Sequence, residues 1–119
     1  MSERRALVAE DSLLILMGLE MLLEQEEISV VGPASTVAQA LALVDQGGFD
    51  IAILDINLHN ESSYPVADLL VERGIPFVFT TGYVPDALPP RFGGALCIQK
   101  PYEPDALMVL VAQAFSRIQ

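Results

Sequence analysis

The feature that most constrains the fold is a nearly unbroken apolar run from Phe49 to Asn57, which carries the carboxylate of Asp55 close to its end. Successive side chains of a strand point to opposite faces of a sheet, so a strand that is apolar at neighbouring positions is buried on both faces. Such strands are typical of parallel sheets covered by helices on both sides. We therefore predict that Asp55 lies at the carboxyl end of a buried strand, where open α/β sheets bind their ligands.

Four further segments have the composition of short strands, and most of the five are followed by apolar residues at helical spacing. The other predicted strands cover residues 5–9, 28–31, 75–80 and 95–99, with Gly32-Pro33 closing the second one. The predicted helices cover about 12–26, 36–45 and 65–73, and a last helix begins at Pro104. Strands that alternate with helices form right-handed crossovers and a parallel sheet. We predict a three-layer, doubly wound α/β sandwich with a five-stranded sheet of order 2-1-3-4-5.

Two details of this prediction concern the first helix and the third loop. Asp11 or Ser12 can cap the first helix, and Leu14, Met17 and Met21 are expected on its inner face. The polar run from His59 to Ser63 is predicted to be a loop.

The segment Val84 to Gly94 contains three prolines and two glycines where a fourth helix would be due. Proline lacks an amide donor and clashes with the preceding helical turn, so we predict an irregular or short fourth helix. Val84, Leu88 and Phe92 offer little periodic apolar surface, and we expect the segment to be mobile until the domain is activated.

Length and charge exclude several classes of protein. The 119 residues, 52% of them hydrophobic, fit one domain covering residues 1–119. Sixteen acidic against six basic residues give a net charge of −10, which argues against a nucleic-acid partner. We find no membrane-spanning segment and no signal peptide, so we expect a cytoplasmic protein without a membrane partner. The single cysteine, Cys97, is expected to pack as a small apolar residue.

Acidic and hydroxyl side chains follow three of the predicted strands. Glu10 and Asp11 follow the first, Asp55 ends the third, and Thr80 and Thr81 end the fourth. Each has an ordinary alternative reading: the two acids could only begin a helix, Asp55 could be a turn residue and the threonines could be strand residues. Their joint position at one edge of a parallel sheet favours a site.

These motifs resemble those of the receiver domain of bacterial two-component response regulators. The resemblance rests on Glu10-Asp11 after the first strand, Asp55 after the third, Thr81-Gly82 after the fourth and Lys100-Pro101 after the fifth. It covers essentially the whole chain. It implies a signalling phosphoacceptor, and not a separate enzyme, that takes a phosphoryl group from a histidine kinase or a histidine phosphotransfer protein and acts through a downstream protein partner.

The resemblance also implies a role for each residue of the site. Asp55 would be the phosphoacceptor and a metal ligand, Asp11 a direct ligand, Glu10 a ligand through water, and Asn57 a ligand through its main-chain carbonyl. Three neighbouring carboxylates repel one another unless a cation lies between them, and Mg²⁺ fits oxygen ligands best, with Mn²⁺ as an alternative.

Two further roles follow from the same resemblance. Thr81 would hydrogen-bond a phosphoryl oxygen, and Lys100 would reach the same group as a point charge; alone, Lys100 could equally be a solvated charge before a turn. The peptide after this lysine is usually cis in the family, and Pro101 makes that tolerable.

The segment from Phe77 to Tyr83 resembles the Phe-Ala-Thr-Gly signature of a subgroup of single-domain receivers. Members of this subgroup often work with kinases of the HWE or a related type. Many receivers carry Tyr or Phe where this chain has Cys97, so Tyr83 is the residue we expect to act as the conformational switch.

Two other functions share parts of this pattern. A phosphohydrolase of the haloacid dehalogenase type also uses a strand-end Asp with Mg²⁺, but its acid/base residue lies two positions later, where this chain has Asn57. A docking module that is never phosphorylated can share the fold but generally lacks part of the acidic set. Here the full set is present: Glu10, Asp11, Asp55, Thr81 and Lys100.

Overall fold

A computed structural model describes residues 3–82 and 88–118 of the chain. Five parallel strands form one sheet in the order β2-β1-β3-β6-β7, which is the predicted order 2-1-3-4-5. The strands of this sheet are β1 (Arg4–Ala9), β2 (Ile28–Ala34), β3 (Ile51–Asp55), β6 (Phe77–Thr81) and β7 (Leu96–Gln99). The helices are α1 (Leu13–Gln25), α2 (Val37–Gln46), α3 (Tyr64–Glu72) and α4 (Pro104–Ser116).

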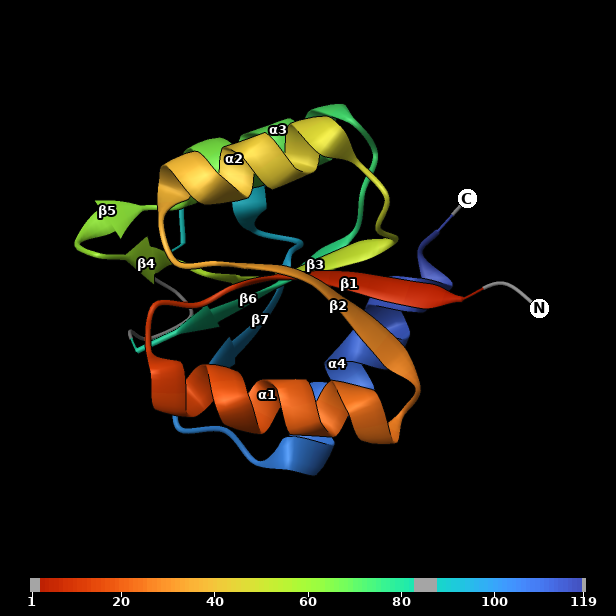
Figure 1. Cartoon of the computed structure of the whole chain (residues 1–119). Helices are drawn as coiled ribbons and strands as arrows, with labels where there is room; N and C mark the ends of the chain where they lie inside the picture. Colours follow the sequence, from red (N-terminus) through yellow and green to blue (C-terminus); the bar gives the residue numbers. More distant parts are fainter. Residues whose placement is uncertain (1–2, 83–87, 119) are drawn as a thin grey trace.

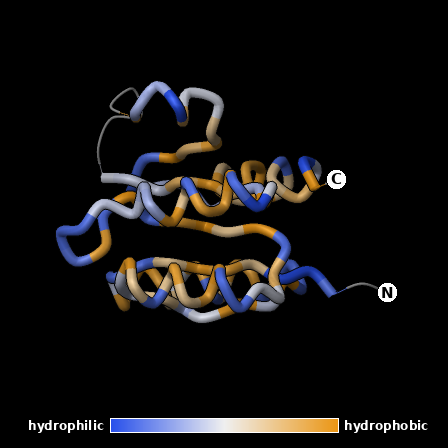
Figure 2. The backbone as a smooth tube through the Cα atoms, turned by 90° about the horizontal axis from the view of Figure 1, so that it is seen from above, coloured by the Kyte–Doolittle hydropathy of each residue, from blue (hydrophilic) through white to orange (hydrophobic). Residues whose placement is uncertain are grey.

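The helices cover the sheet in two layers, α1 with α4 on one face and α2 with α3 on the other (Figure 1). Two apolar clusters fill the space between the layers, and all five residues of β3 are buried. Figure 2 shows that positions along the helices alternate between hydrophobic and hydrophilic, as expected for helices with one face on a core. The predicted three-layer α/β sandwich is therefore confirmed.

The strand register aligns the carboxyl ends of the central strands. Ala9 of β1 pairs with Leu54 of β3, and Asp55 pairs with Thr80 of β6. Residues that follow β1 and β3 therefore emerge at the same edge of the sheet.

β2 does not end at Gly32-Pro33 as predicted, because it continues to Ala34. Proline is tolerated here since β2 is an edge strand, and its register with β1 shifts between Leu7 and Ala9. Gly32 has φ +99°, and a Cβ at this residue would lie 3.0 Å from the Ala34 nitrogen. The shifted register lets the Glu10 amide donate to the Ala34 carbonyl at 2.9 Å.

The inner face of α1 was predicted wrongly. Leu14, Met17 and Met21 are 81%, 55% and 61% exposed. The residues that bury α1 against the sheet are Leu16, Leu19 and Leu23. The helix is apolar on nearly every side, so periodicity alone did not distinguish its two faces.

The predicted loop after β3 is a short hairpin. β4 (Asn57–Leu58) pairs antiparallel with β5 (Glu61–Ser62), and Leu58 is fully buried. The turn residues His59 and Asn60 have φ of +49° and +64°. Two successive positive φ values are typical of the type I′ turn, which matches the twist of a two-residue hairpin.

Among the described residues between β6 and β7, the regular structure is a single 3-10 turn, η2 (Pro90–Phe92), in agreement with the predicted irregular or short helix. The apolar contribution of Phe92 was underestimated, because its side chain is only 3% exposed. Its ring lies 5.4 Å from those of Tyr64 and Phe79 and 6.4 Å from that of Phe77. No helix in the described part of the chain is long and apolar enough to cross a membrane.

Candidate phosphorylation and cation site

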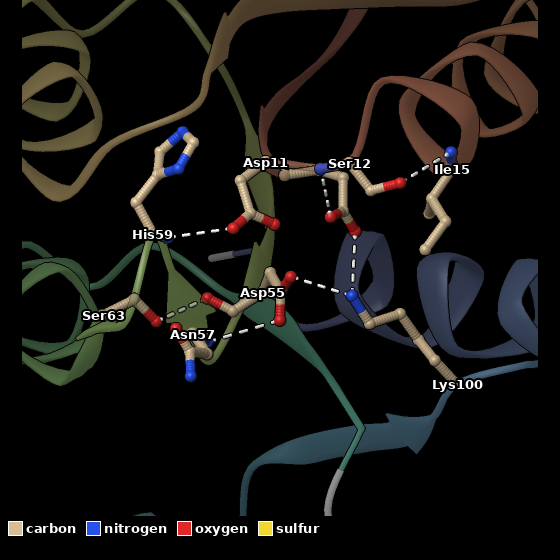
Figure 3. Close-up of polar contacts among 9 residues, drawn as sticks. Asp11, Ser12, Ile15, Asp55, Asn57, His59, Ser63 and Lys100 are labelled. Atoms are coloured by element: carbon tan, nitrogen blue, oxygen red, sulfur yellow. Dashed lines mark hydrogen bonds and ion pairs between the residues drawn. The ribbon is translucent and has the colours of Figure 1, made fainter.

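Three carboxylates meet at the carboxyl edge of the sheet. Glu10 and Asp11 follow β1, Asp55 ends β3, and one oxygen of each lies within 4.8 Å of the others. The predicted acidic cluster is thus present in the fold (Figure 3).

Glu10 is the most enclosed of the three, with 3% of its surface exposed. Its Oε2 accepts a hydrogen bond from the Ser12 amide at 3.0 Å, and its Oε1 accepts one from Lys100 Nζ at 3.2 Å. Burial, with the charge of Asp55 as a further cause, raises the pKa of Glu10 despite these donors. The protein therefore holds this carboxylate charged at a cost.

Asp11 has the opposite balance. Burial raises the pKa of Asp11, but the hydrogen bond from the His59 amide and the side-chain interaction with Glu10 outweigh that effect, so the pKa of Asp11 is lowered. The His59 amide donates to Asp11 Oδ2 at 2.9 Å (Figure 3). Asp11 is therefore the acid of the cluster whose charged form is favoured.

Asp55 is held through both its side chain and its backbone. Oδ2 accepts a hydrogen bond from Lys100 Nζ at 2.8 Å, and Oδ1 accepts one from the Asn57 amide at 3.3 Å. The hydroxyl of Ser63, a fully buried residue, donates to the Asp55 main-chain carbonyl at 2.6 Å. These contacts fix the carboxylate at the end of its strand.

Lys100 brings the only described ammonium group to the cluster. Burial lowers the pKa of Lys100, but its contacts with Asp55 and Glu10 outweigh this, so the pKa is raised and the side chain stays charged. The Lys100 amide also donates to the Thr81 carbonyl at 2.6 Å, which joins the end of β7 to the end of β6. The peptide from Lys100 to Pro101 is cis, as the resemblance implied.

Most of the predicted site residues lie together. A depression of about 460 Å³ is lined by Asp11, Asp55, Asn57, His59, Asn60, Gly82 and Lys100. Thr81 is buried at the end of β6, beside the strand that carries Asp55. Tyr83, the predicted switch, lies outside the described residues.

Sequence reasoning missed two participants, Ser63 and the amide of His59. Ser63 was assigned to a polar loop, and a backbone amide leaves no signal in the side-chain pattern. Cys97 is half-buried, and burial raises the pKa of its thiol, as expected for a packing residue.

The donor set fits a hard divalent cation. The three carboxylates Glu10, Asp11 and Asp55 supply oxygen ligands on one side of the depression, and Asn57 borders it. Their three negative charges face one ammonium, which leaves an excess of two negative charges. Oxygen ligands with excess negative charge are the environment that Mg²⁺ prefers.

Comparison with known proteins agrees with this arrangement. The family model described as the response regulator receiver domain matches residues 6–112. The phyllosphere-induced regulator PhyR of Methylorubrum extorquens is 34% identical over 117 residues, which cover 91% of this chain and 42% of the regulator. The sensory transduction protein LytT of Bacillus cereus is 32% identical over 108 residues, which cover 87% of this chain and 44% of LytT. The chain spans about half the length of the curated relatives it matches.

Solved structures with a similar fold agree with the match to the family model. SdrG from Sphingomonas melonis Fr1 is 45% identical, with a TM-score of 0.81, and the match covers 98% of both chains. The BeF3-activated conformation of SdrG, from Pseudomonas melonis Fr1, is 41% identical with a TM-score of 0.79, and covers 96% of this chain and 98% of that one.

Proposed function

Because the chain belongs to the response regulator receiver domain family, we propose that Asp55 accepts a phosphoryl group from a histidine kinase or a histidine phosphotransfer protein. The observation that carries this proposal is the position of Asp55, buried at the end of β3 with a carboxylate cluster on one side and Lys100 on the other. A carboxylate so placed has a cation-binding side and an ammonium for the charge of the incoming group.

In the proposed reaction, a carboxylate oxygen of Asp55 forms a bond to phosphorus while the bond from phosphorus to the histidine nitrogen of the donor breaks. The electron pair of the broken bond stays on that nitrogen. The product is an aspartyl phosphate. Lys100 binds an oxygen of the transferred group, which replaces part of its present contact with Asp55.

Magnesium, with manganese as an alternative, would be held by Asp11, by Asp55, by Glu10 through water and by the main-chain carbonyl of Asn57. The cation would supply charge neutralisation for the transferring phosphoryl group. The buried position of Glu10, which no described cation other than Lys100 contacts, supports a need for further positive charge here.

The remaining roles follow the same mechanism. The Thr81 hydroxyl would bind a phosphoryl oxygen after transfer, and Tyr83 would change its packing in response. Residues 1–119 would form one receiver domain, within which the family model matches residues 6–112. The sequence from Phe77 to Tyr83 leads us to assign the chain to the single-domain subgroup with the Phe-Ala-Thr-Gly signature, and hence to an HWE or related kinase. The match to SdrG, which covers 98% of both chains, supports a single receiver domain.

The output would be a protein contact, since the net charge of −10 disfavours binding to nucleic acid. The similarity to the phyllosphere-induced regulator PhyR supports such a regulatory output. We propose that the domain acts in the cytoplasm as a signalling phosphoacceptor whose only chemistry is its own phosphorylation and dephosphorylation.

A phosphohydrolase is disfavoured by the residue type at Asn57. This residue lies two positions after Asp55, where the haloacid dehalogenase pattern needs an acid/base side chain, and an amide cannot transfer a proton in that role.

The proposal is tested with Asp55→Asn, which preserves shape but removes the nucleophile. Incubation with a small phosphodonor and Mg²⁺ should add one acid-labile phosphoryl group to the wild type and none to the variant, as read by intact-mass spectrometry. Asp45→Asn is the matched control, because Asp45 is an exposed acid outside the site. Full labelling of Asp55→Asn would reject the assignment.

A further inference from the structure

We infer that the β4–β5 hairpin positions the cation site, and that the backbone amide of His59 sets the orientation of Asp11. The inference rests on the proposed function, because it concerns the cation that phosphorylation would use. His59 is a positioning residue in this scheme and acts only through its N–H group.

The hairpin is tied firmly to the protein at its base. Leu58 is fully buried in the cluster beneath α2 and α3, and the Ser63 amide donates to the Ile56 carbonyl at 2.8 Å. The antiparallel pairs Asn57 with Ser62 and Leu58 with Glu61 close the ladder. An element held at its base in this way presents its turn in a defined place.

From that base the turn reaches Asp11, in the loop that follows the neighbouring strand β1. The His59 amide donates to Asp11 Oδ2 at 2.9 Å, although 48 positions separate the two residues in sequence. With Oδ2 engaged by the amide, the other carboxylate oxygen of Asp11 lies on the side of the labelled Asp55 (Figure 3). The bond therefore selects the orientation in which Asp11 completes the cluster.

The same segment also contacts Asp55, on the β3 side of the site. It begins at Asn57, whose amide donates to Asp55 Oδ1, and it is followed directly by Ser63, whose hydroxyl donates to the Asp55 carbonyl. One short element thus contacts the acid from β1 and the acid from β3. Hydrogen-bond partners that orient metal ligands often matter for affinity as much as the ligands do.

The His59 side chain does not take part in these contacts. Figure 3 shows the imidazole directed away from Asp55 and Lys100, and the residue is exposed. Removing the side chain should therefore have little effect, whereas removing the N–H group should impair the site. This contrast separates the inference from any role for the imidazole.

The sharpest test replaces the amide N–H of residue 59 by an ester oxygen, with lactic acid incorporated at that position. The matched control is His59→Ala, which has the same methyl side chain as the lactic acid residue but keeps the N–H donor. Mg²⁺ affinity is measured by isothermal titration calorimetry on the full chain. We expect His59→Ala to bind Mg²⁺ within about twofold of the wild type, and the ester to bind it about tenfold more weakly than His59→Ala.

Thermal unfolding in a chelator provides the second readout. A purely structural amide would lower the melting temperature of the ester variant and leave the Mg²⁺ affinity of the folded protein unchanged, and this result would overturn the inference. If the ester variant does not fold, Asn60→Val replaces it, with Asn60→Gly as its control. A β-branched residue is strained at φ +64°, whereas glycine is not, so only Asn60→Val should weaken Mg²⁺ binding.

The wild type distinguishes the two possible failures. If it gains no phosphoryl group on Asp55 and binds no Mg²⁺, the proposed function fails and the inference falls with it. If it does both, and the ester binds Mg²⁺ as tightly as His59→Ala, only the positioning role is refuted.

Discussion

Replacing Lys100 by Met should destabilise the cation-free protein by an amount that depends on pH. The ammonium contacts Asp55 at 2.8 Å and Glu10 at 3.2 Å, and both carboxylates are at least 95% buried. Removing one partner of a buried ion pair costs about 3–5 kcal/mol, because the remaining charge is left unpaired.

The protein can limit this cost by binding a proton at Glu10, because burial already raises the pKa of this residue. Protonating a carboxyl group at pH 7 when its ordinary pKa is 4.5 costs about 3.4 kcal/mol, and this sets an upper limit on the loss from unpaired charge. At pH 5.5 the same proton costs about 1.4 kcal/mol. A carboxyl with a raised folded-state pKa favours the folded state below its ordinary pKa and loses that contribution as the pH rises. We therefore expect Lys100→Met to lose about 3 kcal/mol at pH 7 and about half of that at pH 5.5.

The assay is thermal unfolding followed by circular dichroism in a chelator at the two pH values. For a chain of this length, 3 kcal/mol corresponds to a fall of about 10 °C in Tm at pH 7. Lys100→Arg is the control, because it keeps the charge and should lose much less stability. Addition of Mg²⁺ should reduce the difference in Tm between Lys100→Met and the wild type, since the cation replaces the missing positive charge. A loss below about 1 kcal/mol at pH 7, or one that is the same at both pH values, would refute the reasoning.

Other predictions concern the acids and the aromatic cluster. Glu10→Gln should raise Tm in a chelator at pH 7, and the gain should vanish as the pH falls to the ordinary pKa of 4.5, because the raised pKa of Glu10 means that its charge opposes folding. Asp11→Asn should weaken Mg²⁺ binding in a calorimetric titration without such a gain, because the lowered pKa of Asp11 means that its charge favours folding; a gain equal to that of Glu10→Gln would contradict the assignment. Phe92→Ala should cost about 3 kcal/mol in urea unfolding, because Phe92 is buried among three aromatic rings. Arg91→Ala, which removes an exposed ion pair with Asp68, should cost far less. Equal losses would mean that burial of the Phe92 ring is not what stabilises this segment.

The sheet order and the acidic cluster could be predicted because both depend on a strong local signal. The buried strand β3 is apolar at its first four positions, and its last residue is the carboxylate Asp55. Parallel strands place all such ends at one edge, so Glu10, Asp11 and Asp55 could be assigned to one site without knowledge of any side-chain contact.

The parts that were missed depend on contacts between distant residues or on unusual backbone angles. The hairpin after β3 turns at His59 and Asn60, whereas the common sequence signal for such a turn includes glycine. Phe92 is isolated among prolines and glycines in sequence, and its partners Tyr64, Phe77 and Phe79 come from other elements. No local pattern could indicate that burial.

Helix α1 exposes large apolar residues as well as burying them. Apolar residues surround this helix, so the hydrophobic effect scarcely distinguishes Leu16 and Leu19 from Leu14 and Met17 as the inward set. Polar contacts, in contrast, fix the residue at which the helix begins. Ser12 caps the helix at Ile15, and its amide is hydrogen-bonded to the Glu10 carboxylate. The start of α1 is therefore tied to the acidic edge of the sheet through Glu10, the residue that also accepts a hydrogen bond from Lys100.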